Sequence, residues 1–231
     1  MRQVLKIPAI WVTLLAAILA SMTISSLDPT LSLHLHEINF TVIQTSLVFL
    51  SLGFVFMIFS VVWGAVADAK KTTRTLITCG LIGTAVYFLL LGPSPLFKIH
   101  PTKWLASLAV PFGASMIAMI AMPTFVDMFT SAEWHGIPGG LGLTAIISGL
   151  WNSGYGIGIT IGPLLGSSLV ERYGFAWMST IIAAGCLLVL LVFLPFSIWE
   201  YRCGKGRRVP TSRVVPESTE GEKVQLLPNE V

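Results

Sequence analysis

Long apolar stretches separated by short polar connections dominate the pattern of the 231-residue chain. Six stretches come close to or exceed the roughly 20 residues that a helix needs to cross a bilayer. Their apolar residues are continuous rather than alternating, so the pattern predicts membrane-spanning helices and not the strands of a barrel. The predicted spans are Pro8–Leu27, Val42–Ala67, Thr75–Gly92, Trp104–Phe125, Leu143–Val170 and Phe175–Trp199.

The last part of the chain has a different composition, rich in Pro, Ser, Glu and Lys. Such a segment buries too little apolar surface to form a core. We therefore expect a six-helix transmembrane domain over residues 1–203 and a disordered cytosolic tail over residues 204–231. Between the first two spans we expect a polar loop over residues 28–41.

Lysine and arginine are distributed unevenly between the two sides of the predicted bundle. With the N-terminus placed in the cytosol, eleven of the 14 basic residues are cytosolic. The three on the far side are Lys98, Lys103 and Arg172. Because cytosolic loops of membrane proteins carry the excess of positive charge, this bias predicts that both termini are cytosolic.

The composition excludes several classes of function. Hydrophobic residues make up 54% of the chain and charged residues only 11%, against about a quarter in a soluble domain. The basic residues form no stripe of the kind that binds nucleic acid. The sequence contains no catalytic, metal-binding or phosphate-binding motif, so we expect neither an enzyme nor a protein with a metal or cofactor.

The fifth stretch carries glycine at every fourth position. This spacing places the glycines on one helix face, where a second helix can approach to backbone distance. A proline within the seam removes one helical hydrogen bond and favours a kink. Tight static packing and a bending surface that opens or closes a pathway are both compatible with the pattern. The residues are Gly154, Gly158, Gly162, Pro163 and Gly166.

The end of the second span combines Gly64 and Asp68 with a basic connection that includes Arg74. Topology alone explains the basic residues but not an acid at the membrane boundary. Asp68 could pair with Arg74 or with the positive N-terminus of a neighbouring helix, which favours an anion. Either contact would hold the cytosolic side closed in one conformation.

Two acids and three polar or aromatic residues are candidates for binding a cation or a proton. Asp28 and Asp127 lie near the ends of the first and fourth predicted spans, and carboxylates at membrane depth are usually functional. The alternative for each is a solvated acid at a helix end. Trp151, Asn152 and Tyr155 lie in the first half of the fifth span, where the rings could hold a cation or simply pack.

Two short motifs lie outside the predicted spans. Asn39 begins an Asn-Phe-Thr glycosylation sequon in the loop expected on the luminal side. In the tail, Glu222, Leu226 and Leu227 form an acidic dileucine pattern. Adaptor proteins that sort cargo to endosomes and vesicles read such patterns, so sorting adaptors are expected partners.

Several of these motifs resemble those of the vesicular amine transporters, a family of the major facilitator superfamily, and especially its polyamine-transporting members. The resemblance covers nearly the whole chain but only the C-terminal six of twelve helices. It rests on Leu27-Asp-Pro-Thr-Leu-Ser-Leu33, Gly64–Asp68, Leu89-Leu-Leu-Gly-Pro93, Pro123-Thr-Phe125, Gly158-Ile-Thr-Ile-Gly-Pro-Leu-Leu-Gly166 and Leu226-Leu-Pro-Asn-Glu230.

The resemblance implies a six-helix half of a major facilitator fold, built as a three-plus-three inverted repeat. It also implies proton-driven exchange of polyamines or related amines into acidic vesicles. By resemblance, Gly64 and Asp68 belong to a cytosolic gating loop, the glycine seam is an antiporter motif, and Asp28 and Asp127 match acidic positions of the family. Asn152 departs from the family, because the monoamine transporters carry an aspartate nearby.

These observations predict half of a vesicular amine transporter in a secretory, synaptic-type or endolysosomal membrane. Its expected partners are the bilayer, a small organic cation, protons, and either an N-terminal half or a second copy. Two alternatives remain open. One is a half-sized transporter that works as a homodimer, and the other is a truncated membrane partner or regulator that does not transport.

Overall fold

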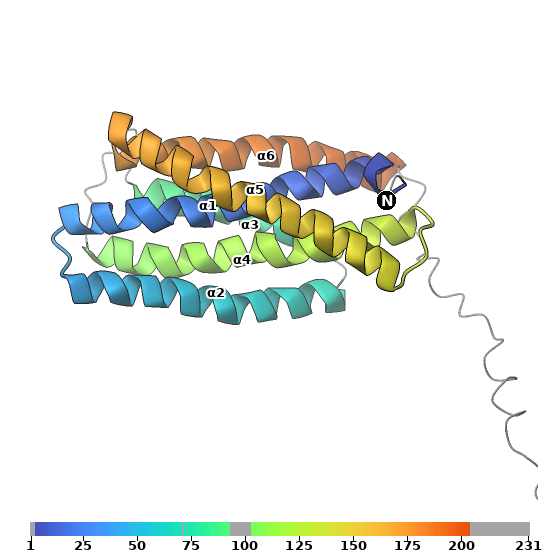
Figure 1. The fold of residues 1–231 in the computed structure, drawn as a ribbon, viewed down its shortest axis with the longest axis horizontal. Coiled ribbons are helices and arrows are strands. Elements are labelled where there is room, and N and C mark those ends of the chain that lie inside the picture. The colour runs from blue at the N-terminus through green and yellow to red at the C-terminus, as the bar shows by residue number, and fades with distance from the viewer. Residues whose placement is uncertain (1–2, 71, 93–102, 204–231) are drawn as a thin grey trace, which may run out of the picture.

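The computed structural model describes residues 3–70, 72–92 and 103–203, and the predicted tail and its dileucine pattern lie outside these ranges. A short 3-10 helix, η1 (Val4–Lys6), precedes six long helices (Figure 1). The helices are α1 (Pro8–Glu37), α2 (Val42–Lys70), α3 (Thr73–Leu91), α4 (Lys103–Trp134), α5 (Leu141–Tyr173) and α6 (Phe175–Cys203). The six apolar stretches thus form the six predicted helices.

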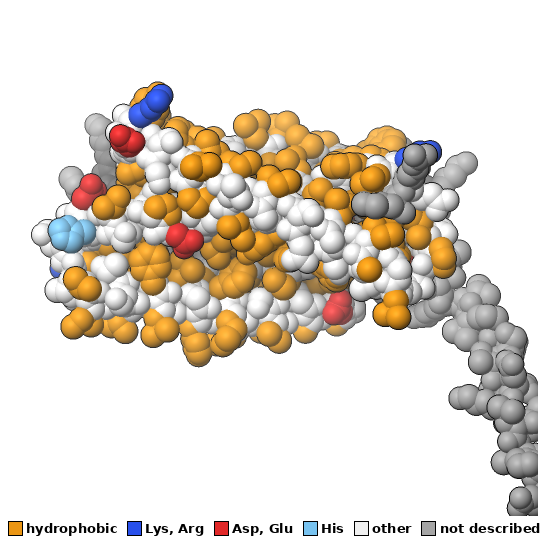
Figure 2. Space-filling model, viewed as in Figure 1, with side chains coloured by type: hydrophobic (Ala, Val, Ile, Leu, Met, Phe, Trp, Pro, Cys, Tyr) orange, Lys and Arg blue, Asp and Glu red, His pale blue; other side chains and the backbone are white. Residues whose placement is uncertain are grey.

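The described chain is an all-helical membrane protein, and hydrophobic side chains lie along the length of the face that Figure 2 shows. Five of its long helices are both long and apolar enough to cross a bilayer, namely α1, α2, α3, α4 and α6. The remaining helix, α5, has 33 residues and therefore the required length. Its glycines and polar residues lower its hydropathy, as the sequence pattern already indicates.

The six helices run alternately up and down the bundle (Figure 1). Residues 3 and 203 therefore lie at one end, which we call the terminal end. The opposite end, which we call the turn end, carries the α1–α2 turn at residues 38–41 and the α5–α6 turn at Gly174. Lys6 and Arg74 belong to the terminal end, and Lys103 and Arg172 to the turn end.

Helix α1 is central and packs against α4, α5 and α6, while α3 packs between α4 and α6. In Figure 1, α5 crosses in front of α1, and α3 and α6 lie behind. Helix α2 lies at the edge, where it packs mainly on α4, and only 6% of its most apolar segment is buried. The face of α2 away from α4 is therefore available to lipid or to another protein.

The first helix is ten residues longer than predicted, so the expected loop over residues 28–41 is wrong. Helix α1 continues through Asp28 and Pro29 and ends at Glu37. Hydroxyl groups support the helix around Pro29, because Thr30 Oγ1 donates to the Ser26 carbonyl at 2.7 Å. Near the end of α1, the buried His34 ring stacks on Phe175 of α6, with ring centroids 3.9 Å apart.

The fourth helix also extends beyond its prediction, from Phe125 to Trp134. This extension places Asp127 inside a helix and not at its end. The side chain of Asp127 is completely buried. The interpretation of Asp127 as a solvated helix-end acid is therefore wrong, and its buried position needs polar partners.

Candidate cation and ion-pair site

Three charged side chains from three helices meet near the terminal end of the bundle. Arg74 comes from the first turn of α3, Asp127 from α4 and Glu200 from α6. Arg74 Nε lies 3.3 Å from Asp127 Oδ1, and Arg74 Nη2 is in direct contact with Glu200 Oε2. All three residues are buried. The ion pairs therefore offset the cost of placing charged groups where neither lipid nor apolar side chains can solvate them. We call these three residues the charge cluster.

Two threonines complete the coordination of the Asp127 carboxylate. Thr13 of α1 donates to Oδ2 at 2.8 Å, and Thr73 of α3 donates to Oδ1 at 3.0 Å. The guanidinium carbon of Arg74 lies 5.7 Å from the centre of the Phe196 ring, within the range of a cation–π contact. The charge cluster links α3, α4 and α6, and the Thr13 hydrogen bond adds α1 to this contact near the terminal end.

The expected contact between Asp68 and Arg74 is not formed. Arg74 is engaged by Asp127 and Glu200, while Asp68 lies exposed near the end of α2. Gly64, one turn before Asp68, has open space around the position of a Cβ atom.

An aromatic group lies one helical turn from the charge cluster. The Trp151 and Tyr155 rings of α5 stack with centroids 5.1 Å apart, and Phe125 of α4 meets Trp151 edge-on at 6.1 Å. Trp151 Nε1 donates to Thr124 Oγ1 at 3.2 Å. Since Thr124 precedes Asp127 by three residues on α4, the rings and the carboxylate share one side of that helix.

The other two candidate residues lie apart from this aromatic group. Asp28 is exposed on α1, fifteen positions beyond Thr13, which corresponds to about 22 Å along the helix axis. Asn152 is exposed on α5, and its Nδ2 donates to the Ser148 carbonyl of its own helix at 2.9 Å. Trp151 is therefore linked through Thr124 to the turn of α4 that precedes Asp127, whereas Asp28 lies far along α1 and the Asn152 side chain bonds within its own helix. Asn39 is exposed in the α1–α2 turn with φ 62°.

The glycine seam of α5 packs on α1, and all four of its glycines are buried. A Cβ atom at Gly158 would collide with the Ser21 hydroxyl and lie 2.9 Å from the Met22 nitrogen. A Cβ atom at Gly162 would lie 2.6 Å from the Met22 carbonyl oxygen. Gly154 faces Leu14, and Gly166 faces Ser26, in the same way. Pro163 is partly buried, and α5 continues through it.

Sequence reasoning missed three residues of this site. Glu200 was detectable, because it is a lone acid in the last turns of an apolar span. Thr13 and Thr73 carry no signal, since hydroxyl groups are common in membrane helices and bond to their own backbone. The α1 partner of the glycine seam was also detectable, because Ala17, Ser21 and Ser25 repeat a small residue at every fourth position.

Comparison with known proteins decides the family. Residues 13–228 match the Major Facilitator Superfamily. The chain belongs to this superfamily. Among its relatives is the MFS-type transporter SLC18B1 of Homo sapiens, 34% identical over 206 residues that cover 88% of this chain and 44% of the relative. The proteins of the same name from Mus musculus and Rattus norvegicus are 32% and 30% identical, and cover 94% and 99% of this chain.

The chain spans about half the length of these relatives, since its matches cover 48% of the mouse protein and 50% of the rat protein. Its six helices are consistent with one six-helix half of a major facilitator fold. The three relatives are transporters by name, and the helices agree with a multi-pass protein in a lipid bilayer.

Proposed function

We propose that this chain is the cation-binding half of a proton-coupled antiporter for polyamines or related organic amines. The observation that carries the proposal is the position of the Trp151–Tyr155 stack, one helical turn from the buried carboxylate of Asp127. Aromatic faces attract ammonium groups through the ring quadrupole, and the two carboxylates of the charge cluster outnumber its one guanidinium group. Together they provide the two kinds of contact that an organic cation needs.

The charge cluster also offers a way to couple amine movement to protons. A proton on Asp127 would neutralise the carboxylate and weaken its attraction for Arg74 and for a bound amine. Proton and amine would then compete for the same group, which is the requirement for exchange in opposite directions. Buried ionisable residues in membrane helices commonly mark proton and substrate pathways.

A second six-helix unit would complete the pathway. In major facilitator transporters the substrate binds between two halves, which rock against each other. Here the outer faces of α2 and α5 expose apolar side chains, including Phe54, Val61, Ile157 and Leu164. We infer that an N-terminal half or a second copy packs on these faces. The Gly64–Asp68 segment and the glycine seam would then lie where the two halves move against each other. Both termini would lie in the cytosol, with the bundle in a vesicle membrane.

Uptake into vesicles with an acidic interior tests the proposal. The full chain is reconstituted alone, and also together with the N-terminal six helices of the human relative. We expect accumulation of labelled spermidine that requires the pH gradient and stops with a protonophore. Absence of gradient-dependent uptake in both preparations, with correctly folded protein, would contradict the proposal.

A non-transporting membrane partner is the second candidate, and the half-length match to the relatives is the observation that favours it. This role predicts no uptake by the chain in either preparation. It also predicts a complex with a separate membrane protein after cross-linking in native membranes. A homodimeric transporter instead predicts uptake by the chain alone and a cross-linked species of twice its mass.

A further inference from the structure

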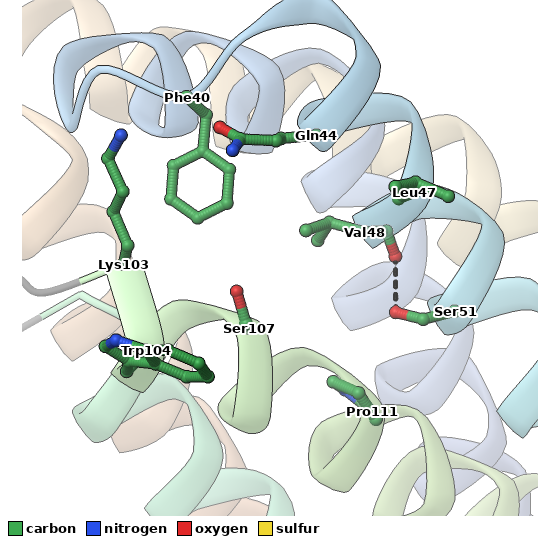
Figure 3. Close-up of a pocket in the computed structure, with 9 residues that line it drawn as sticks. All are labelled: Phe40, Gln44, Leu47, Val48, Ser51, Lys103, Trp104, Ser107 and Pro111. Carbon is green, nitrogen blue, oxygen red and sulfur yellow. Dashed lines mark hydrogen bonds between the residues drawn. The ribbon is translucent and has the colours of Figure 1, made fainter.

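A cleft between α2 and α4 lies at the turn end, away from the charge cluster. Its volume is about 460 Å³. The lining is polar near the mouth, where Lys103 and Gln44 lie. Further along the helices it is mostly apolar, with Leu47, Val48 and Pro111 beside the hydroxyl groups of Ser51 and Ser107. Figure 3 shows Phe40, Val48 and the hydroxyl of Ser107 pointing into this opening. No motif predicted a site here, and the proposed transport mechanism does not use it.

The mouth of the cleft is suited to an anion. Lys103 Nζ donates to the Asn39 carbonyl at 2.7 Å and lies 5.6 Å from the centre of the Phe40 ring. These contacts hold the ammonium group at the mouth, and an ammonium has three donors, so a ligand oxygen can accept another. The N-terminus of α4, which begins at Lys103, adds its positive partial charge. An organic cation would be repelled at this position.

The remainder of the cleft is suited to a hydrocarbon chain. From Lys103 to Pro111 the cleft follows α4 for about 12 Å towards the middle of the bundle. On the outer side, the Trp104 side chain is 81% exposed and Leu108 is 70% exposed, so the wall continues into surface that a bilayer covers. A tryptophan beside a lysine at a helix end is typical of the membrane–water interface.

We propose that the α2–α4 cleft binds an anionic phospholipid from the leaflet at the turn end, with its phosphate at Lys103 and an acyl chain along Leu47, Val48 and Pro111. The combination of one cation at the mouth and apolar walls beyond it matches a lipid with a negative headgroup. A neutral lipid lacks the net charge that Lys103 attracts, and a soluble anion lacks the chain that the walls accept. The proposal requires only that the chain lies in a bilayer, and it does not depend on the transported substrate.

Photo-cross-linking in lipid nanodiscs tests this site. The full chain is embedded in nanodiscs of phosphatidylcholine. These contain a small amount of one photoreactive lipid, which is either phosphatidylglycerol or phosphatidylcholine and carries the same diazirine on its acyl chain. Labelled peptides are then identified by mass spectrometry. We expect phosphatidylglycerol to label the cleft segments of α2 and α4 more strongly, and Lys103→Gln to reduce this preference about fivefold. Lys6→Gln, which removes an exposed charge at the terminal end, is the matched control and should retain the preference.

A second variant tests the apolar part of the site independently of charge. Ser107→Trp fills the cleft and should reduce labelling of the cleft segments by both lipids, while circular dichroism shows unchanged helix content. Soluble glycerophosphoglycerol should not compete with the labelled lipid. Equal labelling by the two lipids, an unchanged preference in Lys103→Gln, or displacement by the soluble headgroup would each overturn the proposal.

Discussion

The hydroxyl group of Thr13 on α1 donates a 2.8 Å hydrogen bond to the carboxylate of Asp127 on α4, across 114 positions of the sequence. This contact joins α1, the helix on which the glycine seam of α5 packs, to α4, the helix that bears the buried acid. A change in the charge of Asp127 would therefore be felt directly by α1. The relationship places a candidate proton site and the α1–α5 packing surface in one connected structure.

Replacing Asp127 with Asn tests whether the charge cluster stabilises the fold. The change keeps the size of the side chain and removes its charge, so that Arg74 is left to pair with Glu200. Loss of one partner of a buried ion pair costs 3–5 kcal/mol when nothing replaces it, and because Glu200 remains we expect about 2 kcal/mol. The measurement is the free energy of unfolding in mixed micelles, followed by circular dichroism.

Asp68→Asn is the matched control, because Asp68 is an exposed acid in the same part of the bundle. Its effect should stay within about 0.5 kcal/mol. Equal effects of the two substitutions would show that the buried position of Asp127 has no energetic consequence.

The glycine seam makes a sharper prediction, because a neighbouring glycine provides its own control. Gly158→Ala introduces a Cβ atom into backbone and side-chain atoms of α1, and we expect a loss of about 1–3 kcal/mol, as for other overpacked sites. A Cβ atom placed on Gly156 of the same helix would have no atom of a neighbouring helix within 4 Å. Gly156→Ala should therefore be neutral or stabilising. Thermal unfolding in detergent distinguishes the two variants, and a comparable loss in Gly156→Ala would refute the packing explanation.

The aromatic stack predicts an effect on substrate affinity. Trp151→Ala removes both the ring face and the bond to Thr124, so we expect the apparent affinity for spermidine to fall about fivefold to thirtyfold in the uptake assay. Trp177→Ala, on the partly exposed surface of α6, is the control. Trp151→Phe keeps an aromatic face and should recover part of the lost affinity. Unchanged affinity in Trp151→Ala would remove this ring from the substrate site.

The helices were predictable because each apolar span is long and continuous. The ends were not, since hydropathy marks where a helix leaves lipid rather than where it stops. Helix α1 illustrates the difference: Asp28 and Pro29 interrupt the apolar pattern, yet the helix continues through them to Glu37. Proline removes only the bond to the Ser25 carbonyl there, and membrane helices tolerate such a break where neighbouring helices and hydroxyl side chains surround it.

The candidate site was predictable only in part. Residue type and membrane depth drew attention to Asp127, Trp151 and Tyr155, which remain candidates. The pairing of Arg74 depends on how α3, α4 and α6 pack. Asp68 is near Arg74 in sequence and was therefore the obvious partner. The structure instead pairs Arg74 with acids 53 and 126 positions away. Such distant contacts leave no trace in the local pattern of a single sequence.

Labelling of single cysteines tests the six-pass arrangement most directly. Cys79, Cys186 and Cys203 are replaced by serine, and one cysteine is introduced by Lys6→Cys, Arg202→Cys or Arg172→Cys. Cells are treated with a membrane-impermeant maleimide after the plasma membrane alone is permeabilised, and again after all membranes are opened. We predict that positions 6 and 202 react in the first step and that position 172 reacts only in the second. Labelling of positions 6 and 202 in different steps would contradict an even number of crossings and with it the bundle described above.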